Sequence, residues 1–323
     1  MKILCRVALA ALCLSFFARM PALAQVEYPS RPIRIVVGFT PGGGNDIIAR
    51  VFGQKLSESL GQPVIIENKP GAGAMLATEY VARSAPDGYT LLVGASGAMT
   101  ISPAVYEKIN YDTMRDFKPV SSLGSFPLIL IVNAKSEFKS LADLVTYAKA
   151  NPDKTNYSSS SAAFQLATEL FKQKTGAPMQ MIPYKGANDS VTAVISGEVT
   201  ATIADAGPVI SQVNGGLARA LAVAAPTRAE SLPNVPTMKE AGADVEAVLW
   251  SGIFVPAATP PEIVRKLEAE FVRIARLPDV VARLKLLNID SVGNSSEEFS
   301  RIIAADLERW RAVARAGNIK IAQ

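Results

Sequence analysis

Apolar stretches rich in β-branched residues alternate with helically spaced apolar residues along most of the chain. In the first third, each predicted strand leads into a helix through a short turn that contains Gly, Asn or Ser. The pattern predicts strands at 33–40, 63–68 and 89–96, with helices at 46–60 and 74–84. This alternation is typical of α/β folds built on a parallel sheet.

A second series with the same rhythm follows the segment "MRDFKPVSSLGSFPL", in which the pattern predicts no strand or helix. It predicts strands at 128–133, 155–160, 180–184, 200–206 and 219–225, and helices at 140–151, 163–176 and 190–198. A Pro-rich segment, "LPNVPTMKEAG", then leads to "WSGIFVP", and the rest of the chain is helical in pattern. The sequence therefore predicts two α/β lobes, each a mostly parallel sheet flanked by helices.

The terminal helices are amphipathic, and we expect them to cover the sheet of the first lobe. Apolar residues recur there at helical spacing: Phe299, Ile302, Ile303, Leu307 and Trp310. The chain would then leave the first lobe near residue 125 and return near residue 252. This predicts a first domain of residues 25–125 plus 252–323, a second domain of residues 126–251, and a two-segment hinge beside a cleft.

The first 24 residues have the pattern of a secretory signal peptide. Lys2 and Arg6 precede an apolar stretch that ends in "ALA" before Gln25. A lipoprotein would need a small residue before Cys13, where Leu12 stands, so lipid anchoring is the less favoured alternative. We therefore predict a mature protein that is released into the periplasm.

The amino-acid composition excludes several kinds of catalytic site. Both cysteines, Cys5 and Cys13, lie in the predicted signal peptide, and the chain contains no histidine. Thiolate nucleophiles, Ser-His pairs, the usual zinc sites and haem ligation by His or Cys are therefore excluded in the mature protein. We expect no enzyme, no metal and no cofactor. Losing Lys2, Arg6 and Arg19 also lowers the net charge from +4 to +1, so we expect no nucleic-acid partner.

The segment "GFTPGGGNDIIAR", residues 38–50, places three glycines between the first strand and the first helix. Backbone N–H groups at such a position, with the positive end of the helix dipole, favour an anionic group. We expect Asn45 or Asp46 to cap the helix, which would make the acid a structural group. The alternative is a strand-to-helix turn that binds nothing. We favour the anion site, because sheet ligands gather at the carboxyl ends of strands.

Known catalytic and nucleotide-binding motifs fit poorly. "GAGAML" has Leu76 where the third small residue of a dinucleotide motif belongs, and the glycine loop lacks the Gly-Lys-Ser/Thr ending of a P-loop. "GASGA" does not have the spacing of a nucleophile elbow, and Ser136 with Lys139 in "SEFK" is better explained by helix capping.

Small polar side chains follow several predicted strands. Ser96 ends the third strand, the segment 158–161 is a run of serines, and Asp205 ends the strand "TATIAD". Hydroxyl groups can bind a carboxylate without a buried countercharge, and Asp205 can accept a hydrogen bond from a ligand hydroxyl or amine. Helix capping is the alternative for the serines and for Asp205. Phe39 could pack on an apolar ligand or belong to the core.

Several long segments together resemble the Bug-type receptors of the tripartite tricarboxylate transporter family. They are "RPIRIVVGFTPGGGNDIIAR", "VIIENKPGAGAMLATEYVARSAPDGYTLLVG", "PYKGANDSVTAVISGEVTATIAD", "ALAVAAPTR", "LPNVPTMKEAG" and "WSGIFVPAATPPEIVRKL". The resemblance covers essentially the whole chain after the predicted signal peptide. It implies a two-lobed periplasmic binding protein of type II that closes over a small organic anion.

The resemblance also implies which residues bind the ligand. Carried over residue by residue, they are Phe39, Thr40, Gly42, Gly43, Gly44, Asp46, Ser96, Ser160, Ser161 and Asp205. Two departures affect this assignment. After "NYSS" the family usually has glycines and often a histidine, where this chain has Ser159 to Ala163 and Gln165, and the usual "PGAGG" ends here in Ala74.

The function implied is capture of a mono-, di- or tricarboxylate, which could be aromatic, and its delivery to membrane permease subunits by a monomeric receptor. The alternative is a ligand-sensing subunit for a membrane kinase that has no role in transport. Both roles depend on closure driven by ligand binding, so the sequence does not separate them.

Overall fold

The computed structural model describes residues 28–321, so the predicted signal peptide lies outside the described residues. The chain divides into a short unit of residues 1–30 and a large unit of residues 31–323. The description below concerns the large unit. No helix within residues 28–321 combines the length and the apolar character that a membrane span needs.

The first three strands form a parallel group, and helices connect them. β1 pairs with β2 on one side and with β3 on the other, with Ile35 opposite both Ile66 and Leu91. The elements are β1 (Ile33–Val37), α2 (Gly44–Leu60), β2 (Val64–Asn68), η1 (Ala72–Ala74), α3 (Met75–Ala82), β3 (Thr90–Ala95), η2 (Gly97–Ile101, one turn of π-helix), α4 (Ser102–Val105) and α5 (Thr113–Asp116).

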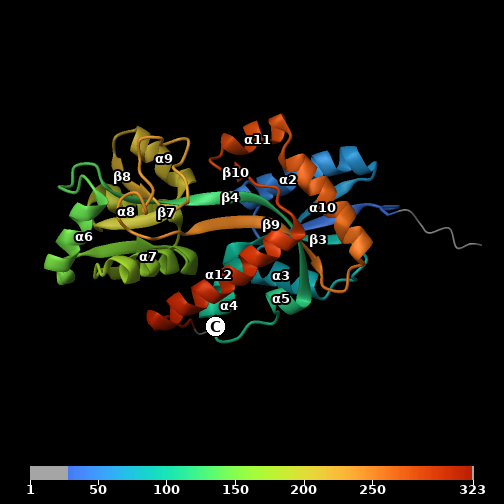
Figure 1. Ribbon diagram of the computed structural model, residues 1–323, viewed down its shortest axis with the longest axis horizontal. Coiled ribbons are helices and arrows are strands. Elements are labelled where there is room, and N and C mark those ends of the chain that lie inside the picture. Colours follow the sequence, from blue (N-terminus) through green and yellow to red (C-terminus); the bar gives the residue numbers. More distant parts are fainter. Residues whose placement is uncertain (1–27, 322–323) are drawn as a thin grey trace, which may run out of the picture. The chain divides into compact units, whose positions relative to one another are not determined.

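Two long antiparallel strands occupy the centre of the sheet (Figure 1). β4 (Phe117–Asn133) pairs with β9 (Val248–Pro256) from Phe117 opposite Pro256 to Pro127 opposite Val248. Residues 117–127, in which the sequence pattern predicted no strand, therefore form the first part of β4. The sheet is mixed, because the two segments that connect the lobes, β4 and β9, are strands that pair antiparallel within it. β9 also pairs antiparallel with β3, with Val93 opposite Ile253.

The second series forms another parallel group at the far end of β4. β5 pairs in parallel with β6 and β7, while β7 and β8 run antiparallel to β4. The elements are α6 (Leu141–Ala150), η3 (Pro152–Lys154), β5 (Asn156–Ser159), α7 (Ala162–Thr175), β6 (Gln180–Pro183), α8 (Ala187–Ser196), β7 (Ala201–Asp205), α9 (Ala206–Asn214) and β8 (Ala218–Val223). Within residues 28–321 the strands form one ten-stranded sheet with the main order β2-β1-β3-β9-β4-β7-β5-β6.

The final elements are α10 (Pro261–Ala275), α11 (Pro278–Lys285), β10 (Asp290–Ser291) and α12 (Ser296–Ala316). Helix α12 packs on the first lobe as expected, and it also extends to the second series of elements. Its first half packs Phe299, Ile303 and Leu307 against a core cluster with Val36 and Leu92. Its second half packs Trp310, Val313 and Ala314 in a different cluster, together with Phe164, Leu170 and Phe171 of α7.

The two-lobed α/β fold predicted from the sequence is thus confirmed, with antiparallel strands between two parallel groups. The domain boundaries near residues 125 and 252 stay a prediction. Both positions fall inside β4 and β9, so the two predicted hinge segments are one continuous ribbon of paired strands.

Candidate functional site

A cavity of about 600 Å³ lies at the carboxyl ends of strands from both parallel groups. The first part of the chain contributes Phe39, Gly42, Gly44, Asn45, Ile47, Gly73, Ala95, Ser96, Gly97, Ile101, Ser102 and Tyr106. The second group contributes Ser160, Ser161, Ala162, Ala163, Asp205, Ala206 and Gly207. The central strands and the α11–β10 loop complete the lining with Phe126, Leu249, Trp250, Ser251, Leu287, Asn288 and Ile289.

The structure brings most of the predicted ligand-binding residues together at this cavity. Phe39, Gly42, Gly44, Ser96, Ser160, Ser161 and Asp205 line it. The other three predicted residues lie close in sequence but do not line the cavity. Thr40 and Gly43 are exposed in the glycine loop, and Asp46 is buried beneath that loop. Lys185, a cation that follows β6 closely in the sequence, does not line the cavity either.

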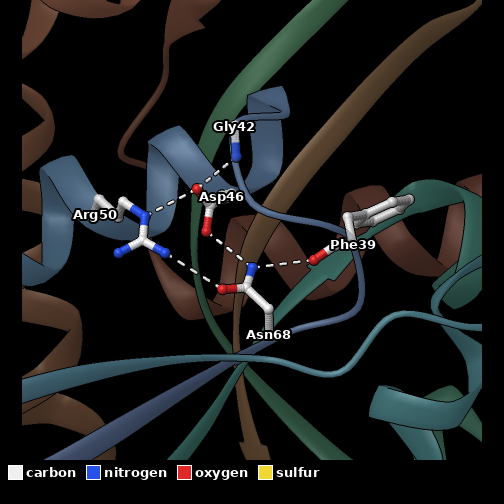
Figure 2. A network of polar contacts seen from close by, with 5 residues as sticks. All are labelled: Phe39, Gly42, Asp46, Arg50 and Asn68. Atoms are coloured by element: carbon white, nitrogen blue, oxygen red, sulfur yellow. Dashed lines mark hydrogen bonds and ion pairs between the residues drawn. The ribbon is translucent and has the colours of Figure 1, made fainter.

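Asp46 fixes the shape of the glycine loop (Figure 2). Its Oδ2 accepts hydrogen bonds from the backbone N–H of Gly42 and from Arg50 Nε, both at 2.9 Å. Its Oδ1 accepts from Asn68 Nδ2 at 2.8 Å, and the same amide group donates to the carbonyl of Phe39 at 3.0 Å. The network ties both ends of the loop that carries Phe39 and Gly42 to α2 and to the end of β2.

The expected helix cap at Asn45 or Asp46 was wrong. The N-cap residue of α2 is Gly43, and no side chain caps this helix. Asp46 instead reaches back to the N–H of Gly42, ahead of the helix. Burial opposes ionisation of this carboxyl, but the hydrogen bonds from Arg50, Gly42 and Asn68 outweigh it and hold the pKa of Asp46 below its ordinary value. Asp46 therefore stays a charged group that holds the loop.

Ser96 and Trp250 form another part of the cavity lining, and hydrogen bonds fix both residues. The backbone N–H of Trp250 donates to Ser96 Oγ at 3.2 Å, so the Ser96 hydroxyl keeps its own hydrogen as a donor. The indole Nε1 of Trp250 donates to Asp306 Oδ2 at 2.7 Å, and Arg309 donates to Asp306 Oδ1 at 2.6 Å. Helix α12 thereby fixes the orientation of the Trp250 ring, because both Asp306 and Arg309 belong to it.

Helices α2, α7 and α9 begin at this cavity. The first turns of α2, α7 and α9 all contribute lining residues, and η2 adds Gly97. The Ser161 hydroxyl caps α7 by accepting from Phe164 N–H, as its capping alternative predicts. First-turn N–H groups are unsatisfied by their own helix and carry positive partial charge, so several of them around one cavity favour an anion.

Asp205 is the one acidic residue in the lining. It occupies the N-cap position of α9, yet its side chain makes no capping bond, so the capping explanation fails. Its Oδ1 is buried and has no hydrogen-bond partner within the described part of the chain. Burial raises the pKa of Asp205 above its ordinary value. A buried acceptor without a partner costs free energy, which a ligand donor would recover.

We expect Asp205→Asn to stabilise the unliganded protein at pH 7 by about 1 kcal/mol, because an uncompensated buried carboxylate is removed. Since folding raises the pKa of Asp205, its contribution to stability is full below the unfolded-state pKa and is lost as pH rises through the raised value. The gain in Tm should therefore shrink as pH falls toward about 4. Thermal unfolding of both proteins from pH 4 to 8 measures this, and a pH-independent difference would contradict it.

Several lining residues were not identified from the sequence. Gly97 and Gly207 sit in first turns of helices, and a Cβ added at either would have no neighbour within 4 Å. Glycine at these positions leaves space in the cavity, and no steric conflict in the fold explains it. Leu287, Asn288 and Ile289 come from a loop without any motif, so only the folded structure could place them at the site.

The lining contains no lysine or arginine, and no group of three or more His, Cys, Asp or Glu side chains within residues 28–321 could hold a metal ion. A largely apolar cavity at strand ends and helix N-termini, between two α/β lobes, is suited to reversible capture of a small solute. Fold and site together define a periplasmic binding protein.

Sequence comparison supports the same class. The sequence profile of the tripartite tricarboxylate transporter family receptor, TctC, matches residues 48–319, and the chain belongs to this family. This is a family of periplasmic solute-binding receptors, which are not enzymes. The chain is 36% identical to Protein BugT of Bordetella pertussis over 298 residues, which cover 91% of each chain.

Solved structures agree in fold. R. palustris Rpa4515 with adipate is 32% identical, has a TM-score of 0.78, and the match covers 92% of this chain and 100% of that one. MatC of Rhodopseudomonas palustris with bound malate is 29% identical, has a TM-score of 0.74, and the match covers 88% and 99% of the two chains. The family resemblance seen in the sequence is thereby confirmed.

Proposed function

We propose that this protein is a periplasmic receptor that captures a small organic anion by a carboxylate group and delivers it to membrane permease subunits. The observation that supports the proposal best is the cavity itself. Helix N-termini surround it, its polar groups are hydroxyls, amides and the single carboxyl of Asp205, and it contains no lysine or arginine. Neutral donors can hold an anion without burying a permanent countercharge, which suits reversible binding.

The ligand contacts we propose are the predicted ones. Gly42, Gly44 and Ser96 would meet a ligand carboxylate, while Ser160, Ser161 and Asp205 would meet its far end. Phe39 would pack on its body. Thr40, Gly43 and Asp46 would act through the conformation of the glycine loop, which the network of Asp46 with Arg50 and Asn68 maintains. The relatives with adipate and malate are receptors of the same family with carboxylate ligands.

A panel of small carboxylates should contain a ligand that raises the Tm by about 5 °C at one hundred times its dissociation constant. Binding only to the folded protein contributes about 2.7 kcal/mol there, and each kcal/mol raises the Tm of a chain of this size by roughly 2 °C. The methyl ester of the same ligand is the control, since it lacks the negative charge. Equal shifts with acid and ester, or recovery of a chemically altered ligand, would contradict the proposal.

Transport requires a second experiment in cells. Deletion of the gene should abolish uptake of the ligand that the panel identifies. Normal uptake together with a lost transcriptional response to that ligand would instead indicate a sensing subunit.

A further inference from the structure

The walls of the cavity provide a large apolar surface. Phe39, Tyr106, Phe126, Leu249, Trp250 and Ile289 all line it. A cavity of about 600 Å³ with such walls accommodates a ring or a chain of similar bulk. Apolar ligand surface that leaves water for these walls contributes favourable free energy, roughly 25 cal/mol per Å². The lining therefore favours a ligand whose middle part is apolar.

The charges around the cavity are unequal at its two sides. The glycine-loop side presents first-turn amides of α2, with Gly97 and the Ser96 hydroxyl. The side formed by the β7–α9 junction presents first-turn amides of α9 and, next to them, the carboxyl of Asp205. The lining contains no lysine or arginine, so no cationic side chain in it offsets the negative charge that Asp205 adds to this side.

Space for a ligand group is available beside Asp205. Gly207, two residues further on, also lines the cavity, and a Cβ added there would have no neighbour within 4 Å. The first turn of α9 therefore puts no side chain into the cavity at Gly207, two residues after the acid. A hydroxyl, amine or amide of a ligand placed there would donate a hydrogen bond to the Asp205 carboxyl.

Resting on the proposed function, we propose that the preferred ligand is a monocarboxylate with an apolar body and a hydrogen-bond donor at its far end, which binds Asp205. Dicarboxylates and tricarboxylates are then poor ligands of this chain. A second carboxylate beside Asp205 would add like-charge repulsion, and an ionised carboxylate has no hydrogen to donate to the Asp205 carboxyl. In this respect the chain differs from its relatives that have been solved with adipate and malate.

Two matched series of probes test this by calorimetry at pH 7. The first is hexanoate, 6-hydroxyhexanoate and adipate, and the second is benzoate, 4-aminobenzoate and terephthalate. In at least one series, the donor-bearing acid should bind about 10- to 100-fold more tightly than the parent acid, as a hydrogen bond to a charged group predicts. The diacid should bind more weakly than the parent acid.

Asp205→Ala and the near-isosteric Asp205→Asn distinguish recognition from a structural effect. In Asp205→Ala the donor-bearing acid should bind within about threefold of the parent acid, since a difference that small is less than one hydrogen bond contributes. Asp189→Asn removes another acid of the second lobe that does not line the cavity, and it should change neither preference.

The outcomes are distinct. If a diacid binds as tightly as the donor-bearing acid in the same series, or if the donor preference persists in both Asp205 variants, the inference on ligand class is overturned and the receptor function stands. If no acid of either series binds to the folded wild-type protein, the proposed carboxylate receptor function fails as well.

Discussion

Gly97→Leu is expected to weaken ligand binding at least 100-fold while the protein stays folded. Gly97 lines the cavity directly after Ser96, and a Cβ at this position would meet nothing within 4 Å. A leucine side chain would therefore occupy space that the ligand needs. Leucine is also a better helix former than glycine, so the free energy of unfolding should change by less than about 1 kcal/mol.

Gly186→Leu is the matched control, because Gly186 has an ordinary extended backbone as the N-cap residue of α8 and does not line the cavity. Titration calorimetry with the ligand found in the carboxylate panel, together with thermal unfolding, measures both effects. Wild-type affinity in Gly97→Leu would show that the ligand does not approach η2, and the site would have to be placed elsewhere.

Phe299→Ala should have the largest effect on stability, a loss of about 3–5 kcal/mol and a fall in Tm of roughly 6–15 °C. The Phe299 side chain is fully buried. Its ring centroid lies 5.0 Å from that of Trp250 and 5.2 Å from that of Phe254. A Cβ at Gly252 would approach the Phe299 ring to 2.4 Å, so this glycine makes room for the ring on β9.

The control is Ile302→Ala on the same helix, because Ile302 is 36% exposed. Its loss should be clearly smaller, since only part of its apolar surface leaves water on folding. Urea unfolding of both variants gives the two free energies. Equal losses for the two variants would mean that the aromatic cluster does not anchor α12 to β9.

The apolar strands were predictable because their own residues are sufficient to indicate a strand. β1, β3 and the second half of β4 are rich in Ile, Val and Leu, and these apolar side chains are buried. The first half of β4 was missed because Pro119, Gly124 and Pro127 are typical of turns. That segment is a strand because β9 pairs with it along its length, with register shifts beside Pro119 and Gly124. Pairing with a strand more than a hundred residues away leaves no local pattern.

The candidate site likewise contains residues that the sequence predicts and residues that only the folded structure identifies. The glycine loop, Ser96 and Asp205 were predictable, since small and polar residues after strands indicate a ligand site in α/β proteins. The role of Asp46 was not, because it depends on Asn68 and Arg50 meeting it from two different elements. Trp250 and the loop 287–289 reach the cavity only through the return of the chain after the second lobe.

The position of β9 between β3 and β4 has a consequence for the order of folding. The sheet stays incomplete until a strand from the last quarter of the chain, Val248–Pro256, inserts between strands that were synthesised much earlier. Such long-range pairing slows folding, because a long loop must close before the contacts that stabilise it can form. An emerging chain of this topology would remain without its native sheet for most of its synthesis.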